Sequence, residues 1–127
     1  MSRKALIITD GTKSVETLAQ PIKSALSGFS VCVCSADKFT GNDLLAADIF
    51  FIGAEKPKPA SFSYLEEMFA HINLASRKCA VFSTCEKTLK WLSGIIKDSE
   101  ASLGDTLLSL DGGYQEADIK KWIKGLL

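Results

Sequence analysis

The sequence lacks the features that mark nucleic-acid-binding, membrane and secreted proteins. Fifteen basic residues balance fifteen acidic ones, so the formal net charge is zero and indicates neither nucleic acid nor a membrane surface as a partner. No unbroken apolar run approaches the ~20 residues of a membrane span, and the apolar stretch after residues 1–4 is too short for a signal peptide. We therefore expect a soluble, cytoplasmic protein.

Metal-binding and paired-thiol patterns are also missing. The chain has one histidine, and its four cysteines form no Cys-x-x-Cys pair. Because structural zinc needs four converging Cys or His ligands, we expect no metal site. Cys32, Cys34, Cys79 and Cys85 lie in or beside apolar stretches, and we expect buried, reduced thiols. Cys85 alone lies near the expected start of a helix, where thiol pKa values tend to fall.

Two common phosphate-binding motifs are absent as well. The sequence has no Gly-x-Gly-x-x-Gly after its first apolar stretch and no Gly-x-x-x-x-Gly-Lys-Ser/Thr at any position. A dinucleotide-binding fold and a P-loop NTPase are therefore disfavoured. A phosphoacceptor receiver domain would need an aspartate after its third strand, where this chain has Gly53-Ala54-Glu55.

What the sequence does contain is a regular alternation of strand-like and helix-like patterns. We predict strands over residues 4–9, 29–35, 48–54, 78–85 and 107–110. Apolar residues recur at helical spacing over residues 15–26, 65–72, 89–96 and 119–126, with a short helix or turn at 40–47. Residues 48–54 are apolar on both faces, which is typical of a central strand covered by helices on both sides.

This alternation predicts a single α/β domain over residues 1–127. Parallel strands joined by right-handed crossovers give a three-layer α/β/α sandwich, here with a five-stranded parallel sheet in the order 2-1-3-4-5. In such sheets ligands bind beyond the carboxyl ends of the strands, at the point where the strand order reverses. The loops that line this point are expected to be residues 9–14, 54–61 and 83–87.

The first of these loops is the strongest candidate for a ligand site. It consists of Thr9, Asp10, Gly11, Thr12, Lys13 and Ser14. Free backbone N–H groups, hydroxyls and the helix dipole favour an anion at such a strand–loop–helix junction, most often a phosphate. Simple helix capping, in which Thr9, Asp10 or Ser14 accepts a hydrogen bond from an N–H group, is the alternative.

In order and spacing, these segments resemble the flavodoxin family over nearly the whole chain. Flavodoxins hold the phosphate of flavin mononucleotide (FMN) in a loop of the type Ser/Thr-x-Thr-Gly-x-Thr. The stretch Thr9-Asp10-Gly11-Thr12-Lys13-Ser14 is similar and keeps hydroxyls at the first and last positions. Residues 47–53 and 78–85 are similar to the third and fourth strands of the family, and residues 110–113 with 118–122 to its closing strand and helix. The chain is identified as a divergent, short-chain member.

The resemblance implies that the protein binds FMN and acts as an electron carrier rather than as a turnover enzyme. Beyond the first loop, the implied cofactor-binding residues are Gly53, Ala54, Glu55, Lys56, Ser83, Thr84, Cys85 and Glu86. No catalytic residue and no metal ligand are implied. The redox partner protein is unknown, and we expect a monomer or weak dimer that binds neither nucleic acid nor membranes.

Two other functions remain open at this stage. Flavodoxins often clasp the flavin ring with aromatic residues, but residues 54–61 contain none, and Phe62 and Tyr64 are the nearest candidates. The order of glycine and threonine at Gly11 and Thr12 is also reversed relative to the family pattern. These departures favour a cofactor-less flavodoxin-like binding or regulatory module. An FMN-dependent oxidoreductase acting on a quinone-like substrate is the third hypothesis.

Overall fold

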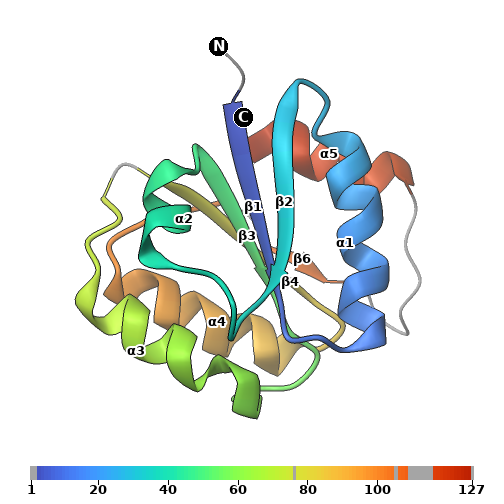
Figure 1. Cartoon of the computed structure of the whole chain (residues 1–127). Coiled ribbons are helices and arrows are strands. Elements are labelled where there is room, and N and C mark those ends of the chain that lie inside the picture. Colours follow the sequence, from blue (N-terminus) through green and yellow to red (C-terminus); the bar gives the residue numbers. More distant parts are fainter. Residues whose placement is uncertain (1–2, 76, 105, 109–115, 127) are drawn as a thin grey trace.

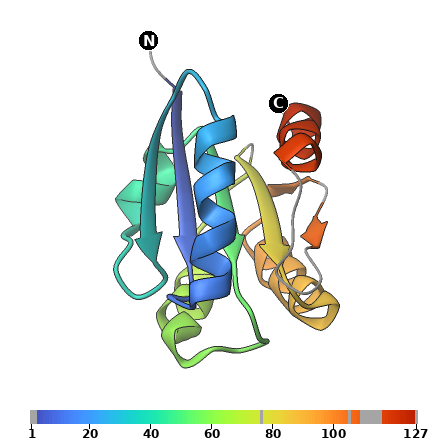
Figure 2. The same ribbon diagram turned by 90° about the vertical axis from the view of Figure 1, so that its right-hand side faces the viewer.

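A computed structural model describes residues 3–75, 77–104, 106–108 and 116–126, and it has helices on both faces of a parallel sheet (Figures 1 and 2). The strands are β1 (Arg3–Thr9), β2 (Phe29–Ser35), β3 (Ile49–Gly53), β4 (Lys78–Ser83), β5 (Ser102–Leu103) and β6 (Leu107–Leu108). The helices are α1 (Lys13–Ala25), α2 (Gly41–Ala46), α3 (Ser63–His71), α4 (Glu86–Asp98) and α5 (Glu116–Leu126), with a 3-10 turn, η1 (Ala60–Phe62), before α3.

The strand order is β2-β1-β3-β4-β5, with all paired strands parallel. This confirms the predicted three-layer sandwich and the predicted order. Within the described residues, no helix combines the length and the apolar character that crossing a membrane requires.

The fifth position of the sheet is filled by two short strands, where the sequence predicted one. β5 and β6 both pair with β4, on the edge away from β3. Leu103 pairs with Cys79 and Leu107 pairs with Phe82. The edge therefore advances by four residues where β4 advances by three, which is one residue more than continuous pairing would need. The prediction located β6 but missed β5, and the predicted end of the strand at Leu110 lies outside the described residues.

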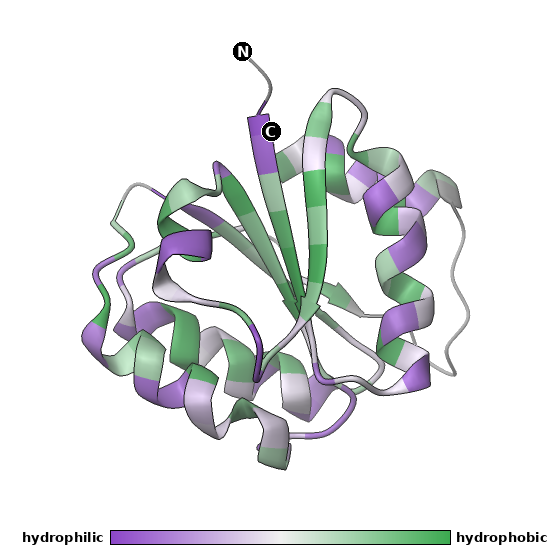
Figure 3. Cartoon of the chain, in the orientation of Figure 1, coloured by the Kyte–Doolittle hydropathy of each residue, from purple (hydrophilic) through white to green (hydrophobic). Residues whose placement is uncertain are grey.

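Two apolar clusters hold the layers together, one on each face of the sheet. Because side chains alternate along a strand, β3 serves both: Phe50 and Ile52 enter the cluster beneath α3 and α4, and Phe51 enters the one beneath α1 and α5. All five residues of β3 are buried, which confirms the predicted central strand. Figure 3 shows apolar residues along the strands and polar ones on the outward helix faces.

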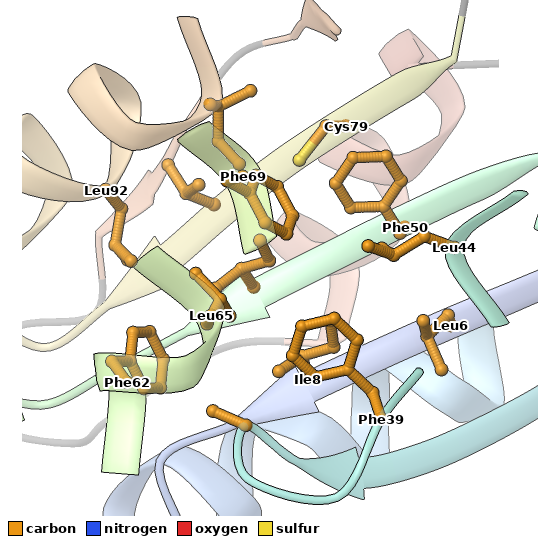
Figure 4. Packing of buried hydrophobic residues seen from close by; sticks show 14 of the residues in the cluster. Leu6, Ile8, Phe39, Leu44, Phe50, Phe62, Leu65, Phe69, Cys79 and Leu92 are labelled. Carbon is orange, nitrogen blue, oxygen red and sulfur yellow. The ribbon is translucent and has the colours of Figure 1, made fainter. Parts of the chain in front are cut away.

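Aromatic rings make up much of the cluster beneath α3 and α4 (Figure 4). Phe69 of α3 meets Phe50 of β3 and Phe39 in edge-to-face arrangements, with ring centroids 5.9 and 6.5 Å apart. Such pairs add to the free energy that area burial alone contributes. This packing fixes α3 over β3 and so positions the loop between them, which borders the candidate site.

Gly94, in the interior of α4, is a site where alanine should stabilise the protein. A Cβ there would meet open space, and helix interiors favour alanine over glycine by about 0.5–1 kcal/mol. Urea unfolding of Gly94→Ala should show a gain of that size. Gly28→Ala is the control, because its Cβ also meets open space but its φ of +86° should make the change destabilising. Equal effects of the two substitutions would contradict this account.

Candidate functional site

The three predicted loops meet at the carboxyl edge of the sheet. Thr9 at the end of β1 pairs with Gly53 at the end of β3, and Gly53 pairs with Phe82 of β4. Helices α1 and α4 also begin at this edge, directly after β1 and β4. Figure 2 shows the end of β1 leading through a short turn into α1. The structure therefore brings together the residues that the sequence singled out at this switch point.

Asp10 joins the first loop to the loop after β3. One carboxylate oxygen, Oδ1, accepts hydrogen bonds from the Thr12 backbone N–H at 3.0 Å and from the Thr12 hydroxyl at 2.6 Å. The other, Oδ2, accepts from the Glu55 backbone N–H at 2.8 Å. Gly11 lies inside this turn at a φ of +81°, a conformation that suits glycine. Asp10 thus shapes the turn that leads into α1.

The start of α1 has backbone donors that no group of the described residues accepts. Thr12 is the N-cap residue, but its side chain makes no capping hydrogen bond. The first N–H groups of a helix have no partner within the helix. Across the part of the chain that the structure describes, the N–H groups of Lys13, Ser14 and Val15 have no acceptor. Thr9 and Asp10 do accept N–H groups, from Gly11 and Thr12, as the capping alternative expects, but they accept none of these three N–H groups of the helix.

Other side chains of the first loop lie around this helix start. The Thr9 hydroxyl is buried and accepts from the Gly11 N–H at 3.4 Å. Lys13 is exposed on the first turn, while Ser14 is half-buried. The Ser14 hydroxyl donates to Oε2 of Glu55 at 2.9 Å, across the gap between the first loop and the loop after β3.

The loop after β3 is tied to both of its neighbours through Glu55. Its N–H group donates to Asp10, and its carbonyl accepts from the Thr88 hydroxyl of α4 at 3.0 Å. The preceding Ala54 is buried, and its carbonyl accepts from the Ser83 hydroxyl at the end of β4. Lys56, the next residue, is exposed. The backbone at Ala54 and Glu55 is therefore held in place from two sides.

The loop after β4 is short and leads directly into α4. The Ser83 hydroxyl accepts from the Cys85 N–H at 3.0 Å, and Ser83 itself is fully buried. Thr84 and Cys85 are half-buried, and Glu86 is exposed as the first residue of α4. Of these predicted site residues, Ser83 serves to fix the two loops to each other.

Cys85 is the N-cap residue of α4, and this position lowers its pKa. The main cause is hydrogen bonding to the thiolate from the Thr88 backbone N–H, with further contributions from the Thr88 hydroxyl and the Lys87 N–H. The other perturbed cysteines show the opposite effect. Burial raises the pKa of Cys79, and burial together with nearby Cys32 and Asp43 raises the pKa of Cys34 to about 11.

The expectation of buried cysteines holds for Cys79 only. It lies in the core beneath α3 and α4, and all four cysteines are free thiols. Cys34 and Cys85 are half-buried, and Cys32 is exposed. The prediction was wrong for Cys32 because β2 is an edge strand of the sheet, so its side chains are covered less completely than those of β1 and β3.

The aromatic residues nearest the site pack within the protein. Phe62 is fully buried, and its ring centroid lies 5.7 Å from that of Trp91. Tyr64 is 39% exposed and packs on Phe39 at 5.2 Å. Phe62 is therefore unavailable as an exposed face for a planar ring, whereas part of Tyr64 remains accessible.

Thr88 was missed by the sequence reasoning, and Ser61 was included only as the end of the predicted loop 54–61. Thr88 is buried and bonded to Glu55, and the Ser61 hydroxyl reaches the Asp10 carbonyl at 3.5 Å. Thr88 directly precedes Leu89, at the edge of the apolar face of α4, and this position could have indicated that its hydroxyl faces the protein. The hydrogen bond of Ser61 had no such signal, because an irregular loop has no periodic pattern.

Comparison with known structures confirms the flavodoxin fold. Neither a protein-family model nor a curated protein matches the sequence. A short-chain flavodoxin associated with a non-canonical PDU bacterial microcompartment superimposes with a TM-score of 0.85 at 16% identity, covering 99% of this chain and 97% of that chain. A Streptococcus pneumonia flavodoxin gives 0.82 at 19% identity, covering 98% and 97%. A Fusobacterium nucleatum flavodoxin bound to FMN gives 0.70 at 9% identity, covering 98% and 96%.

Proposed function

We propose that the protein binds FMN at the carboxyl edge of its sheet and transfers electrons. The observation that carries this proposal is the start of α1, where the N–H groups of Lys13, Ser14 and Val15 have no acceptor among the described residues. Such a helix start binds phosphate groups well, because its N–H groups and the helix dipole act together. The flavodoxin fold and a structural neighbour described as FMN-bound support the choice of ligand.

The residues present fit the phosphate group of FMN. The three backbone N–H groups would hold its oxygens, and the exposed Lys13 would add a positive charge. The backbone of Gly53 to Lys56 and the segment Ser83 to Glu86 would border the flavin ring, and their hydrogen bonds to each other keep this edge rigid. When bound, the flavin supplies the electron-accepting and electron-donating chemistry, and the protein supplies binding and orientation.

Titration of the purified protein with FMN and with riboflavin tests this function. We expect saturable quenching of FMN fluorescence at one equivalent and weaker binding of riboflavin, because riboflavin lacks the phosphate. In nitrogen-15 NMR spectra, the amide signals of Lys13, Ser14 and Val15 should shift with FMN and stay in place with riboflavin. Unchanged FMN fluorescence and unshifted signals would reject the proposal.

A cofactor-less binding or regulatory module is the second candidate. The observation that favours it is the hydrogen bonding of the site hydroxyls, because those of Ser14, Ser83 and Thr88 all donate to groups of the protein itself. The same titration separates the two candidates, since this module would leave both flavins unbound.

A further inference from the structure

A carboxylate of the protein itself lies beside the proposed phosphate position. Oε2 of Glu55 accepts the hydrogen bond of the Ser14 hydroxyl at 2.9 Å, and Ser14 is the second residue of α1. Negative charge is favourable near a helix start, and the Glu55 carboxylate lies there through the Ser14 hydroxyl, while the N–H groups of Lys13, Ser14 and Val15 donate to no group of the described residues.

The backbone of Glu55 is fixed, and its side chain is the part that is free to turn away. The Glu55 N–H donates to Asp10 Oδ2 at 2.8 Å, and its carbonyl accepts from the Thr88 hydroxyl at 3.0 Å. These two bonds anchor the residue between β1 and α4. The carboxylate can therefore leave Ser14 by side-chain rotation alone, with no rearrangement of the loop backbone.

We propose that Glu55 is a specificity-determining residue whose carboxylate competes with a ligand phosphate for the start of α1. This inference rests on the proposed function and deepens it. A phosphate and a carboxylate held at the same helix start repel each other, so phosphate binding requires the carboxylate to leave. Asp10 adds negative charge nearby, and Lys13 is the positive residue of the first turn. Glu55 therefore reduces the advantage of FMN over riboflavin.

The test compares Glu55→Gln with the native chain, using inorganic phosphate, FMN and riboflavin as separate probes. Glutamine keeps the length of the side chain and removes its charge. We expect the dissociation constants for inorganic phosphate and FMN to fall about tenfold, the scale of one hydrogen bond to a charged group. The phosphate titration is followed at the amide signals of Lys13, Ser14 and Val15, and riboflavin binding should stay unchanged.

Glu16→Gln is the matched control. Glu16 is also an acidic residue of the first turn of α1, but it is exposed, and the Ser14 hydroxyl donates to Glu55 instead. Its removal lowers the local negative charge by the same amount, and we expect phosphate affinity to change by about twofold at most. Thermal unfolding of each variant verifies that the fold is retained.

The outcomes separate this inference from the proposed function. The role of Glu55 would be overturned if Glu55→Gln and the native chain bound phosphate with equal affinity. It would also be overturned if Glu16→Gln raised phosphate affinity as much as Glu55→Gln does. The same conclusion follows if riboflavin affinity rises as much as FMN affinity. If Glu55→Gln gains phosphate affinity while no variant binds FMN, the competing carboxylate stands and the proposed function fails. If FMN binds the native chain and Glu55→Gln alike, the function stands and the competition is refuted.

Discussion

Alanine in place of Phe82 should lower the free energy of unfolding by about 3–5 kcal/mol, the usual cost of deleting a buried phenylalanine ring. Phe82 of β4 is fully buried in the cluster beneath α1 and α5. Its ring lies across Gly53 of β3: a Cβ at Gly53 would be 2.3 to 2.8 Å from three atoms of this ring. The ring thus fills the space that the glycine leaves beside the candidate site.

The contact with Gly53 allows a sharper form of this prediction. Gly53→Ala alone should cost about 1–3 kcal/mol, because the new methyl group overlaps the ring. When Phe82 is already alanine, the overlap is gone, so the double variant should cost less than the sum of the two single changes, by about 0.5–3 kcal/mol. Urea unfolding of the four proteins measures this difference.

Phe69 provides the control for this cycle. It is fully buried like Phe82 but belongs to the cluster on the opposite face of the sheet. Gly53→Ala and Phe69→Ala should therefore add within about 0.5 kcal/mol, as distant sites usually do. Additive costs for Gly53→Ala and Phe82→Ala would contradict the packing described for this edge.

The architecture was predictable because its signals are local and repeated. The apolar run of β3 indicated a strand buried on both faces, and the spacing of Val15, Leu18 and Ile22 indicated the inward face of α1; all of these residues are buried. Alternation of such elements restricts the topology strongly, since crossovers between parallel strands are right-handed. This restriction leaves only a handful of strand orders, and the observed order 2-1-3-4-5 is one of them.

The connections at the site were not predictable, because each depends on pairs that are distant in sequence. Asp10 and Glu55 are 45 positions apart, and nothing near either residue indicates the hydrogen bond between them. The sequence did place both in the proposed cofactor site, but as separate loops. Similarly, Gly53 ended the predicted third strand, while its close contact with Phe82 depends on the register between two strands. The two-residue strand β5 is too short to show a period.

Asp10→Ala should lower the free energy of unfolding by about 2–3 kcal/mol, the second large effect that we expect. The Asp10 carboxylate accepts three hydrogen bonds, two from Thr12 and one from the Glu55 N–H. Hydrogen bonds to charged groups contribute about 1.5–3 kcal/mol each, but the half-exposed carboxylate keeps part of its hydration and the sum is correspondingly smaller. Urea unfolding measures the loss.

The substitution should also weaken FMN binding, because Asp10 connects the two loops that would hold the cofactor. Without it, the Glu55 N–H and the Thr12 N–H lose their acceptors, and the turn before α1 is no longer fixed relative to the loop after β3. We expect FMN affinity to fall about tenfold or more, since misplaced donors no longer converge on the phosphate. Riboflavin affinity should fall less, because the turn before α1 does not hold the ring.

Asp37→Ala is the matched control for Asp10→Ala. Asp37 is exposed after β2, and its carboxylate accepts one hydrogen bond, from the Ser35 hydroxyl at 2.8 Å. Loss of this exposed bond should change the free energy of unfolding by about 0.5 kcal/mol or less and leave FMN binding unchanged. Equal effects of the two substitutions would mean that Asp10 does not join the loops. A larger loss for Asp10→Ala in both measurements would show that one carboxylate supports both the fold and the site.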